Sequence, residues 1–278
     1  FTGVAYFGPF VVKNGRREIK LYGVLFTCLA SRAVHLEVAS SLESDTFILA
    51  LRRFITRRGP VREMRSDNGT NFVGAERELR EAIQEMKHNE IREKMQKESI
   101  DWIFNPPTAS HLGGSWERQI RSARKVLAGL LREHGDRLDE ETFRTLMCEV
   151  ESVINSRPLT TVSSDPKDLD PLTPNQVLTG KSKVVLPPPG NFQRADVYLR
   201  RRWRQVQYLT DTFWRRWKKE YLVNLQERGK WLQPRHNLSV GDVVLIQDDN
   251  APRSTWSICR VTEVETDKLG CVRAVVLR

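Results

Sequence analysis

The stretch that decides the fold follows the first sixty residues and reads Arg65-Ser66-Asp67-Asn68-Gly69-Thr70-Asn71-Phe72. A short apolar stretch from Val61 to Arg65 leads directly into it, and we interpret that stretch as a strand. Asp67 therefore falls at the end of a predicted strand. A carboxylate in this place can join others in holding a divalent metal ion, because hard cations bind oxygen ligands.

The residues before this stretch predict a sheet followed by a helix. Three apolar runs rich in Val, Phe, Leu and Tyr are typical of strands. They cover residues 4–12, 19–29 and 33–38. Asn14-Gly15 lies between the first two runs and is a strong hairpin signal. We expect a helix from an N-cap at Ser44 to about Arg58, because apolar residues recur there at helical spacing and Gly59-Pro60 follows.

The residues after Asp67 continue the alternation of helices and strands. We expect a charged helical region at about 74–97, a strand at 100–104, a helix at about 115–134 and a helix from Asp139 or Glu140 to about 156. Three antiparallel strands followed by this alternation indicate an α/β arrangement around a mixed sheet. Seven prolines between residues 157 and 192 then indicate an extended connector or a linker.

The last third of the sequence has a different pattern. A basic, aromatic helix is expected from about Phe192 to Gln226. Short strands separated by turns follow at residues 242–247, 254–264 and 272–277 and predict a small barrel. The sequence starts at Phe1 rather than Met and ends inside an apolar strand, so we interpret it as a piece of a longer polypeptide whose last domain is truncated.

Composition and charge describe a soluble globular chain with a basic tail. Hydrophobic residues make up 39% and charged residues 29% of the sequence, and no stretch approaches the roughly 18 apolar residues of a membrane span. The net charge is +10, but residues 1–180 carry 26 Lys/Arg against 25 Asp/Glu, whereas residues 181–278 carry 19 against 10. A basic appendage on a nearly neutral domain favours a polyanionic partner, with a solubilising surface as the alternative.

The cysteines and the N-terminus indicate an intracellular protein. Cys28, Cys148, Cys259 and Cys271 are scattered and never spaced as Cys-x-x-Cys, so neither a zinc finger nor a disulfide framework is expected. We expect buried thiols in a reducing compartment. The sequence shows no charged-then-apolar leader of the kind that directs secretion.

Glu117 is the second candidate metal carboxylate. It lies at the head of a predicted helix in the stretch Ser110-His111-Leu112-Gly113-Gly114-Ser115-Trp116-Glu117-Arg118. A strand end and a helix start can converge, as metal-dependent phosphoryl transfer requires. Taken singly, an Asp-Asn-Gly sequence more often forms a turn. A Glu in the first turn of a helix more often only interacts favourably with the helix dipole. The first strand usually supplies a further Asp at such sites, but here it carries no acid.

Several motifs together resemble the integrase core of BEL/Pao-type retrotransposons. They are Tyr6-Phe7-Gly8-Pro9, Tyr22-Gly23-Val24-Leu25-Phe26-Thr27-Cys28, Arg32-Ala33-Val34-His35-Leu36-Glu37, residues 66–72 and Gly113-Gly114-Ser115-Trp116-Glu117. The stretches at residues 241–246 and 256–261 resemble the C-terminal domain of the same integrases. The resemblance implies a catalytic core at residues 1–180, a linker with a basic aromatic helix at residues 181–230, and a C-terminal domain at residues 231–278.

The resemblance also implies a fold, a reaction and partners. The fold would be α/β, with a ribonuclease H-like mixed sheet and flanking helices, then a helical connector and a small SH3-like β-barrel. The reaction would be 3′-end processing and strand transfer that join element ends to target DNA, with Mg²⁺ or Mn²⁺ as cofactor. The partners would be element and target DNA and further copies of the chain. The place of action would be the nucleus, after synthesis in the cytoplasm.

The resemblance assigns the catalytic residues and exposes a gap. Family members carry Asp, Asp and Glu, and Asp67 and Glu117 match the second and third of these, with 49 residues between them. Ala5 stands at the first position. A methyl group cannot bind magnesium, so we expect an inactive or weak enzyme. Glu18, Glu37 and Asp45 are candidate substitutes, and we expect none of them to rescue the site.

Basic residues are candidate DNA contacts. Arg121 and Arg124 follow Glu117 along one helix face, and integrases like this one use basic residues at those offsets against DNA ends. An ordinary solvated face is the alternative. His111 precedes Glu117 in its loop and is a candidate contact to substrate. Arg201 and Arg204 lie among aromatic residues, a mixture that binds phosphates and stacks on bases.

The aromatic residues of the last helix have a second interpretation. A near-heptad spacing joins Leu199, Trp203, Val206, Phe213 and Trp217. This spacing favours packing against a domain or another subunit, with the arginines left for DNA.

Two functions therefore fit the sequence. One is a retrotransposon integrase impaired at its first Asp. The alternative is a non-catalytic DNA- or chromatin-binding protein derived from a decayed or domesticated integrase.

Overall fold

The fold is described from a computed structural model of residues 1–278. The structure describes residues 1–67, 69–84, 100–104, 114–159, 171–181, 190–225, 237–246, 248, 251–267 and 270–278. Of residues 83–84, 114–120, 122, 136 and 223–225 it describes the backbone only. The chain divides into two compact units, residues 1–152 with 190–213, and residues 153–189 with 214–278.

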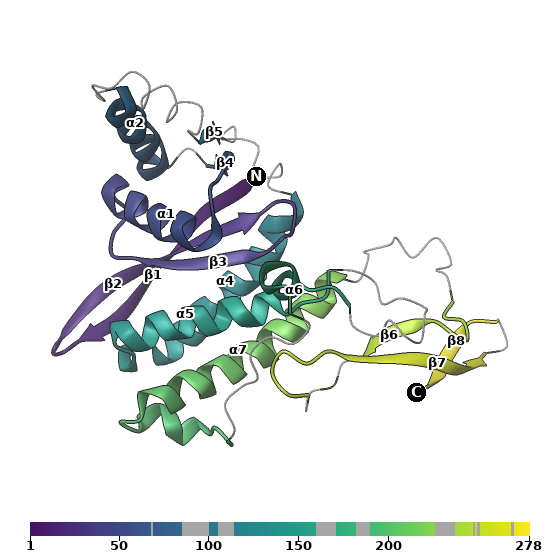
Figure 1. The fold of residues 1–278 in the computed structure, drawn as a ribbon. Coiled ribbons are helices and arrows are strands. Elements are labelled where there is room, and N and C mark those ends of the chain that lie inside the picture. The colour runs from purple at the N-terminus through teal and green to yellow at the C-terminus, as the bar shows by residue number, and fades with distance from the viewer. Residues whose placement is uncertain are drawn as a thin grey trace. The chain divides into compact units, whose positions relative to one another are not determined.

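A five-stranded mixed sheet is the centre of the first unit (Figure 1). Its strands are β1 (Thr2–Asn14), β2 (Arg17–Cys28), β3 (Val34–Ala39), β4 (Glu63–Ser66) and β5 (Asp101–Phe104), in the order β3-β2-β1-β4-β5. β2 pairs antiparallel with β1 and β3, whereas β4 pairs parallel with β1 and β5. The predicted mixed sheet is confirmed. Gly15 has a φ of 63° in the hairpin between β1 and β2, a conformation that glycine adopts without steric cost.

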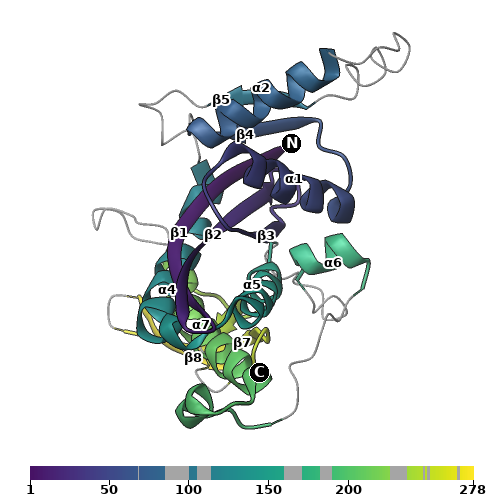
Figure 2. The same cartoon turned by 90° about the vertical axis from the view of Figure 1, so that its left-hand side faces the viewer.

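Helices pack on the sheet and bury its apolar side chains. α1 (Ser44–Arg58) and α2 (Thr70–Gln84) contribute Phe47, Leu51 and Phe72 to a core that includes Val24 and Phe26 of β2. Side chains of β1 also meet α4 (Gly114–His134) and α5 (Glu140–Asn155), which are joined by the short helix η2 (Gly135–Arg137). Figure 2 shows the β1–β2 hairpin curving from the α1 end of the sheet toward α5. The predicted α/β class with flanking helices is confirmed.

Two predicted helix starts are wrong in detail. α1 begins at Ser44 as its first helical residue, and its N-cap is Glu43, whose side chain makes no capping hydrogen bond. α2 begins at Thr70, earlier than expected, because the carbonyl of Gly69 already accepts from the N–H groups of Phe72 and Val73. The continuation of this predicted helical region beyond residue 84 lies outside the described residues.

The predicted helix from Phe192 is divided into two. A 3₁₀ turn, η3 (Arg194–Tyr198), precedes α7 (Arg202–Leu225). The carboxylate of Asp196 caps the first turn by accepting from the Gln193 N–H at 2.8 Å, and it also pairs with Arg204. This local hydrogen bonding ends the turn before α7 begins, and periodicity alone does not reveal it.

The second unit is built around a small antiparallel sheet. Its strands are β6 (Val243–Ile246), β7 (Ser257–Thr266) and β8 (Val272–Leu277), in the order β6-β7-β8. The predicted small β domain is confirmed, and its closure into an SH3-like barrel stays a prediction. The unit also holds the short helix α6 (Pro174–Thr179), which begins with a capping box at Thr173.

An aromatic cluster anchors the last part of α7 within the second unit. Trp214, Trp217 and Tyr221 surround the ring of Trp256 at centroid distances of 5.1, 6.2 and 5.5 Å. The Trp256 Nε1–H donates to the Ser156 carbonyl at 3.0 Å. Residues up to 213 of α7 belong to the first unit and residues from 214 onward belong to the second. The three-part division at residues 180 and 230 stays a prediction.

Two further properties bear on the sequence predictions. No helix in the part of the chain that the structure describes is long and apolar enough to cross a membrane. The four cysteines are free thiols, and none is fully buried: Cys28 and Cys259 are half-buried and Cys148 and Cys271 are exposed. The prediction of buried thiols is therefore wrong, because these residues lie near strand ends or on an outward helix face.

Candidate functional site

The pairing of β1 with β4 sets the position of Ala5. In this parallel pair Thr2 lies opposite Met64 and Gly3 opposite Arg65. Continued by two residues, beyond the end of β4 at Ser66, the same register would set Ala5 level with Asp67. Neighbouring strands lie about 4.8 Å apart, so we expect residues 5 and 67 to be close neighbours at this end of the sheet. The half-buried Ala5 side chain is a methyl group and offers no oxygen to a cation.

The start of α4 lies at the same end of the sheet. Figures 1 and 2 show α4 running from the β4–β5 end of the sheet toward the β1–β2 hairpin. The Arg124 guanidinium of α4 lies 5.8 Å from the ring centre of Phe7. Phe7 and Ala5 share one face of β1, because side chains alternate along a strand. α4 therefore covers the face to which Ala5 belongs.

Asp67 is exposed and holds a turn. Its Oδ1 accepts from the Gly69 N–H at 2.9 Å, and its carbonyl accepts from the Ser66 hydroxyl at 2.9 Å. The Trp102 Nε1–H donates to the same Ser66 hydroxyl at 2.9 Å, which ties this turn to β5. Asp67 thus serves as the turn residue that its motif favours. Its second carboxylate oxygen has no hydrogen bond among the described residues.

The remaining predicted site residues are described in part. Glu117 lies in the first turn of α4, but its side chain is outside the described residues, and so is the whole of His111. Within the described ranges no group of three or more His, Cys, Asp or Glu side chains is placed to hold a metal ion. With Ala5 in place, the described residues do not fit a magnesium or manganese site. The roles of Asp67 and Glu117 as metal ligands stay predictions.

The candidate substitutes for the first Asp do not supply a ligand beside Asp67. Glu37 of β3 is buried and pairs with Arg53 at 2.6 Å, with His35 at 3.0 Å and with Arg57 at 3.2 Å. Burial alone would raise the pKa of Glu37, but hydrogen bonds from His35 and Arg53 outweigh it and lower the pKa. Glu18 pairs across the hairpin with Lys13, at the far end of β1.

Asp45 is exposed in the first turn of α1, where a carboxylate favours the helix dipole. The expectation that these three residues do not rescue the site stays a prediction.

The predicted DNA-contacting arginines have different surroundings. Arg121 and Arg201 are exposed. Arg124 is half-buried over Phe7. Arg204 donates to both carboxylate oxygens of Asp196, at 2.7 and 3.2 Å, and to the Asn191 carbonyl at 2.9 Å. These hydrogen bonds lower the pKa of Asp196. DNA contact by any of these residues stays a prediction, and for Arg204 it would compete with this ion pair.

The packing interpretation of α7 holds for the later positions. Val206, Phe213 and Trp217 are buried. Leu199 and Trp203 are exposed, by 47% and 51%, so they do not pack in the core of this chain, and their packing on another subunit stays a prediction. Leu199 also precedes α7, which starts at Arg202, so the heptad spacing does not include it.

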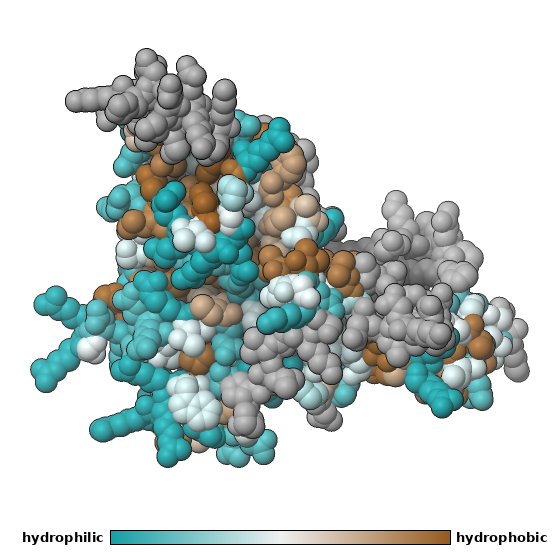
Figure 3. Space-filling view, in the orientation of Figure 1, coloured by the Kyte–Doolittle hydropathy of each residue, from teal (hydrophilic) through white to brown (hydrophobic). Residues whose placement is uncertain are grey.

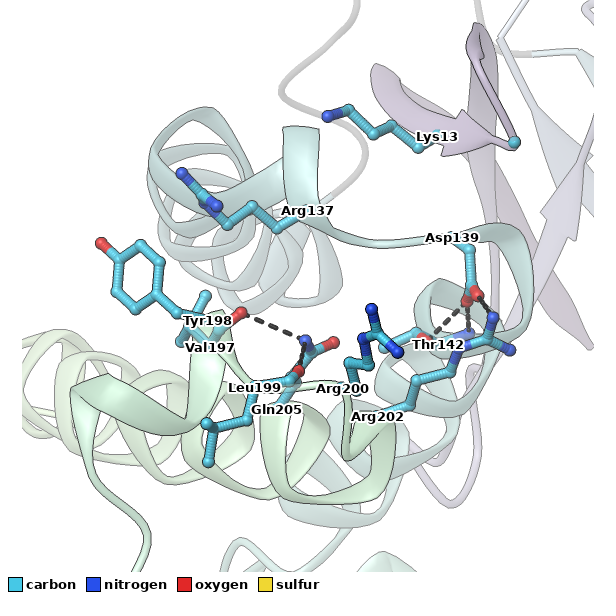
Figure 4. A pocket seen from close by; sticks show the side chains of 11 residues that line it. Lys13, Arg137, Asp139, Thr142, Val197, Tyr198, Leu199, Arg200, Arg202 and Gln205 are labelled. Atoms are coloured by element: carbon cyan, nitrogen blue, oxygen red, sulfur yellow. Dashed lines mark hydrogen bonds and ion pairs between the residues drawn. The ribbon is translucent and has the colours of Figure 1, made fainter.

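A cleft that the sequence did not reveal lies at the hairpin end of β1 (Figure 4). Its volume is about 710 Å³, and it is lined by Lys13, Gly15, Arg137, Asp139, Thr142, Val197, Tyr198, Leu199, Arg200, Arg202 and Gln205. Three separate segments supply these residues: the β1–β2 hairpin, the η2–α5 junction and the η3–α7 junction. Among the lining residues that the structure describes, four side chains are cationic and one is a carboxylate.

Comparison with known proteins gives a family match in the tail and structural neighbours for the fold. A family described as "Family of unknown function (DUF5641)" matches residues 201–278. No curated protein matches the chain. Among solved structures, the chain is similar to the simian T-cell lymphotropic virus intasome in complex with PP2A regulatory subunit B56 gamma, at 15% identity and a TM-score of 0.42. That match covers 69% of this chain and 58% of the intasome chain, so this chain spans less than two thirds of that protein's length.

Two catalytic core domains of integrases are also similar. The BIV integrase core has 14% identity and a TM-score of 0.39, with 64% of this chain and 93% of that chain covered. The HTLV-2 integrase core in complex with magnesium, in a trimeric form, has 16% identity and a TM-score of 0.36, with 64% and 94% covered. The strand order and flanking helices of the first unit give this chain the ribonuclease H-like class of fold.

Proposed function

We propose that this chain is the integrase region of a BEL/Pao-like retrotransposon, that it binds element and target DNA, and that Ala5 impairs its catalysis. The observation that supports the proposal is the parallel register of β1 and β4, with Gly3 opposite Arg65, together with the Arg124 guanidinium of α4 over the Phe7 ring. Extended to residues 5 and 67, this arrangement would allow a strand residue, a neighbouring strand end and a helix start to meet. Metal-dependent phosphoryl transfer needs such a convergence of carboxylates.

The proposed chemistry is transesterification at phosphorus. A water or 3′-hydroxyl oxygen attacks a DNA phosphodiester, and the other ester oxygen leaves. Asp67 and Glu117 are the proposed carboxylates for Mg²⁺ or Mn²⁺, and Ala5 leaves the third position without an oxygen. We therefore infer that this chain retains DNA binding and has lost most of its strand-transfer activity.

Restoring the carboxylate tests the proposal directly. Strand transfer is measured with manganese for the chain, for Ala5→Asp and for Ala5→Asp combined with Asp67→Asn. Ala5→Asp is expected to raise activity by more than about tenfold, because a restored ligand contributes several kcal/mol of charge stabilisation. The added Asp67→Asn change is expected to remove the gain. Ala5→Asn is the matched control for volume and polarity. Measurable and equal strand transfer by the chain and by Ala5→Asp would show that position 5 is not a metal ligand.

The second candidate is a non-catalytic DNA- or chromatin-binding protein derived from a decayed or domesticated integrase. Ala5 itself favours it, because loss of a shared ligand removes chemistry and leaves the sheet intact. If Ala5→Asp is folded and inactive while DNA binding persists with its usual salt dependence, this candidate is preferred. Both candidates would act in the nucleus, and the integrase candidate would act as a multimer, since joining two DNA ends takes more than one copy.

A further inference from the structure

The cleft at the hairpin end of β1 combines positive charge with an open aromatic ring. In Figure 4, Lys13 approaches from the hairpin, Arg137 and Tyr198 lie on one side, Asp139, Thr142 and Arg202 lie on the other, and Arg200 lies between them. The volume of about 710 Å³ is that of a ligand-binding cavity.

Asp139, the carboxylate among the described lining residues, is already engaged. Oδ1 of Asp139 accepts from the Thr142 N–H at 2.9 Å and from the Thr142 hydroxyl at 2.6 Å, and Oδ2 pairs with Arg202 at 2.8 Å. Glu141 pairs with the same Arg202 at 3.5 Å. Acids therefore balance Arg202, and among the described lining residues four cationic side chains stand against this one carboxylate.

The wall of the cleft is held in place before any ligand binds. The Gln205 side chain is buried, and its Nε2 donates to the carbonyls of Val197 and Leu199 at 3.1 and 2.6 Å. On the opposite wall, the Lys13 N–H donates to the Leu138 carbonyl at 2.7 Å and ties the hairpin to the α5 junction. Preorganised walls lower the entropy cost of binding.

Tyr198 supplies a stacking surface. The guanidinium of Arg137 lies 4.6 Å from its ring centre, and yet 56% of Tyr198 remains exposed. An exposed ring with a cation on one face can stack an unpaired base on its open face. Bases within a duplex are already stacked on one another, so this feature favours an unpaired strand.

We propose that this cleft binds a single strand of nucleic acid, with phosphates on Lys13, Arg137 and Arg200 and a base on Tyr198. The proposal goes beyond the function proposed above. Lys13 lies eight residues beyond Ala5 on β1, about 25 Å away at the usual rise of a strand. The strand would therefore bind far from the edge where Asp67 lies.

The surface around the cleft extends its charge. Arg16, Arg17 and Arg201 flank the lining residues and are exposed. Figure 3 shows hydrophilic side chains gathered around the tip of the hairpin and the adjoining helices. A polyanionic strand longer than the cleft thus meets further cations on its way in, which raises the association rate at low salt.

Anisotropy titration of the full chain with a fluorescein-labelled ten-residue oligothymidylate tests the proposal. Lys13→Ala/Arg200→Ala is expected to weaken binding about tenfold or more and to lower the slope of log K against log salt by about 1.4, at roughly 0.7 per phosphate contact. Tyr198→Ala is expected to weaken binding about tenfold and to leave that slope unchanged, because stacking releases no counterions. Tyr198→Phe keeps the ring and is expected to bind within about twofold of the unchanged chain.

The control is Arg52→Ala, an exposed arginine on α1. It is expected to leave both affinity and salt slope unchanged, and thermal melts of each variant check folding. Unchanged binding by the double variant, or equal losses in the double variant and Arg52→Ala, would overturn the proposal. Tyr198→Ala binding as well as Tyr198→Phe would overturn the role of the ring.

Three probes of equal length identify the strand. Oligothymidylate and oligouridylate are both single strands, and the tighter binder tells whether the source is DNA or RNA. A duplex of the same length is expected to bind without dependence on Tyr198. A duplex that loses affinity in all of the cleft variants as the single strands do would contradict the choice of an unpaired strand.

Discussion

The two ends of strand β1 carry different chemistry on the same scaffold. At one end Ala5 lies level with Asp67, and a methyl group stands where the proposed reaction needs a carboxylate. At the other end Lys13 borders a cleft in which one carboxylate is surrounded by cations. At the first end residue 5 carries no charge and apolar packing holds the strand, whereas at the second end the carboxylate of Asp139 takes part in the fold.

The difference lies in what supports each end. Tyr6, next to Ala5, packs on Phe47 and Phe72 at centroid distances of 6.1 and 5.6 Å, so apolar contacts on the opposite face hold this part of β1. At the hairpin end, Asp139 caps α5 and pairs with Arg202. A substitution at position 5 is therefore expected to change stability little, because apolar packing supports the strand there. A substitution of Asp139 is expected to destabilise the fold, because its carboxylate itself supports α5 and Arg202.

Removing the packing behind Ala5 is expected to have the largest effect on stability. Phe47→Ala deletes a fully buried ring that contacts Phe72 and Trp102 at 4.9 and 5.8 Å. The free energy of unfolding is expected to fall by about 3–5 kcal/mol, as for other buried aromatic truncations. Urea denaturation measures the change. Ala5→Asn is the contrasting variant, and a loss of similar size there would contradict the view that residue 5 does not support the fold.

A carboxylate used for structure is expected to rank second. Glu37→Gln keeps the shape of a buried side chain but removes the charge that meets Arg53 and Arg57. We expect a loss of about 2 kcal/mol, below the range for fully buried pairs, because both arginines are partly exposed. Asp67→Asn, at the exposed turn, is expected to cost less than about 1 kcal/mol. Equal losses of unfolding free energy in Glu37→Gln and Asp67→Asn, measured by urea denaturation, would contradict the view that Glu37 supports the fold and Asp67 does not.

The sequence could predict the sheet but not everything that the sheet brings together. Apolar runs such as residues 19–29 indicate strands, because apolar side chains fill both faces of a buried strand. Asn14-Gly15 indicates the hairpin between this run and the run at residues 4–12. The level position of Ala5 and Asp67 was accessible only through resemblance, because pairing register between distant strands leaves no local signal. The start of α7 was missed because the Asp196–Arg204 pair and the capping of η3 depend on specific side-chain contacts.

The basic cleft was missed for a similar reason. Lys13, Arg137 and Arg200 lie far apart in the sequence and share no motif, and folding alone makes them neighbours. The one available signal in the sequence was the excess of basic residues after residue 180. That region includes Arg200 but not Lys13 or Arg137.

Neutralising the carboxylate of the cleft separates its two roles. Asp139→Asn weakens the cap on α5 and the pair with Arg202, so the free energy of unfolding is expected to fall by about 1 kcal/mol. The same change removes a negative charge from the cleft. It is therefore expected to tighten oligothymidylate binding by about a factor of three at low salt. Anisotropy and urea denaturation measure the two effects on one sample. Asp139→Ala is the control that removes the cap as well, and weaker binding by Asp139→Asn would contradict the excess-charge account.

The smallest expected effect is a pH dependence at His35, away from both ends of β1. Its Nε2 lies 3.0 Å from Glu37 Oε1, and its Nδ1 lies 3.2 Å from Glu151 Oε2. Burial alone would lower the pKa of His35, but hydrogen bonds and charges from Glu151 and Glu37 outweigh it and raise the pKa. Arg53, Arg57 and Arg58 contact the same carboxylates and oppose the imidazolium, which keeps the effect small.

The sign of this effect follows from linkage. A raised pKa in the folded state means that protonation of His35 stabilises the fold below the unfolded pKa of about 6.5, and that this contribution is lost as pH rises through the higher folded value. In the neutral form Nδ1 can accept from the Arg58 Nε–H, which is 3.4 Å away, so part of the network survives deprotonation. Urea denaturation from pH 5.5 to pH 9, with His35→Gln as the reference, measures the difference. A stability difference between the two proteins that grows with pH would reverse the assigned direction, and the three arginines would then dominate over the two glutamates.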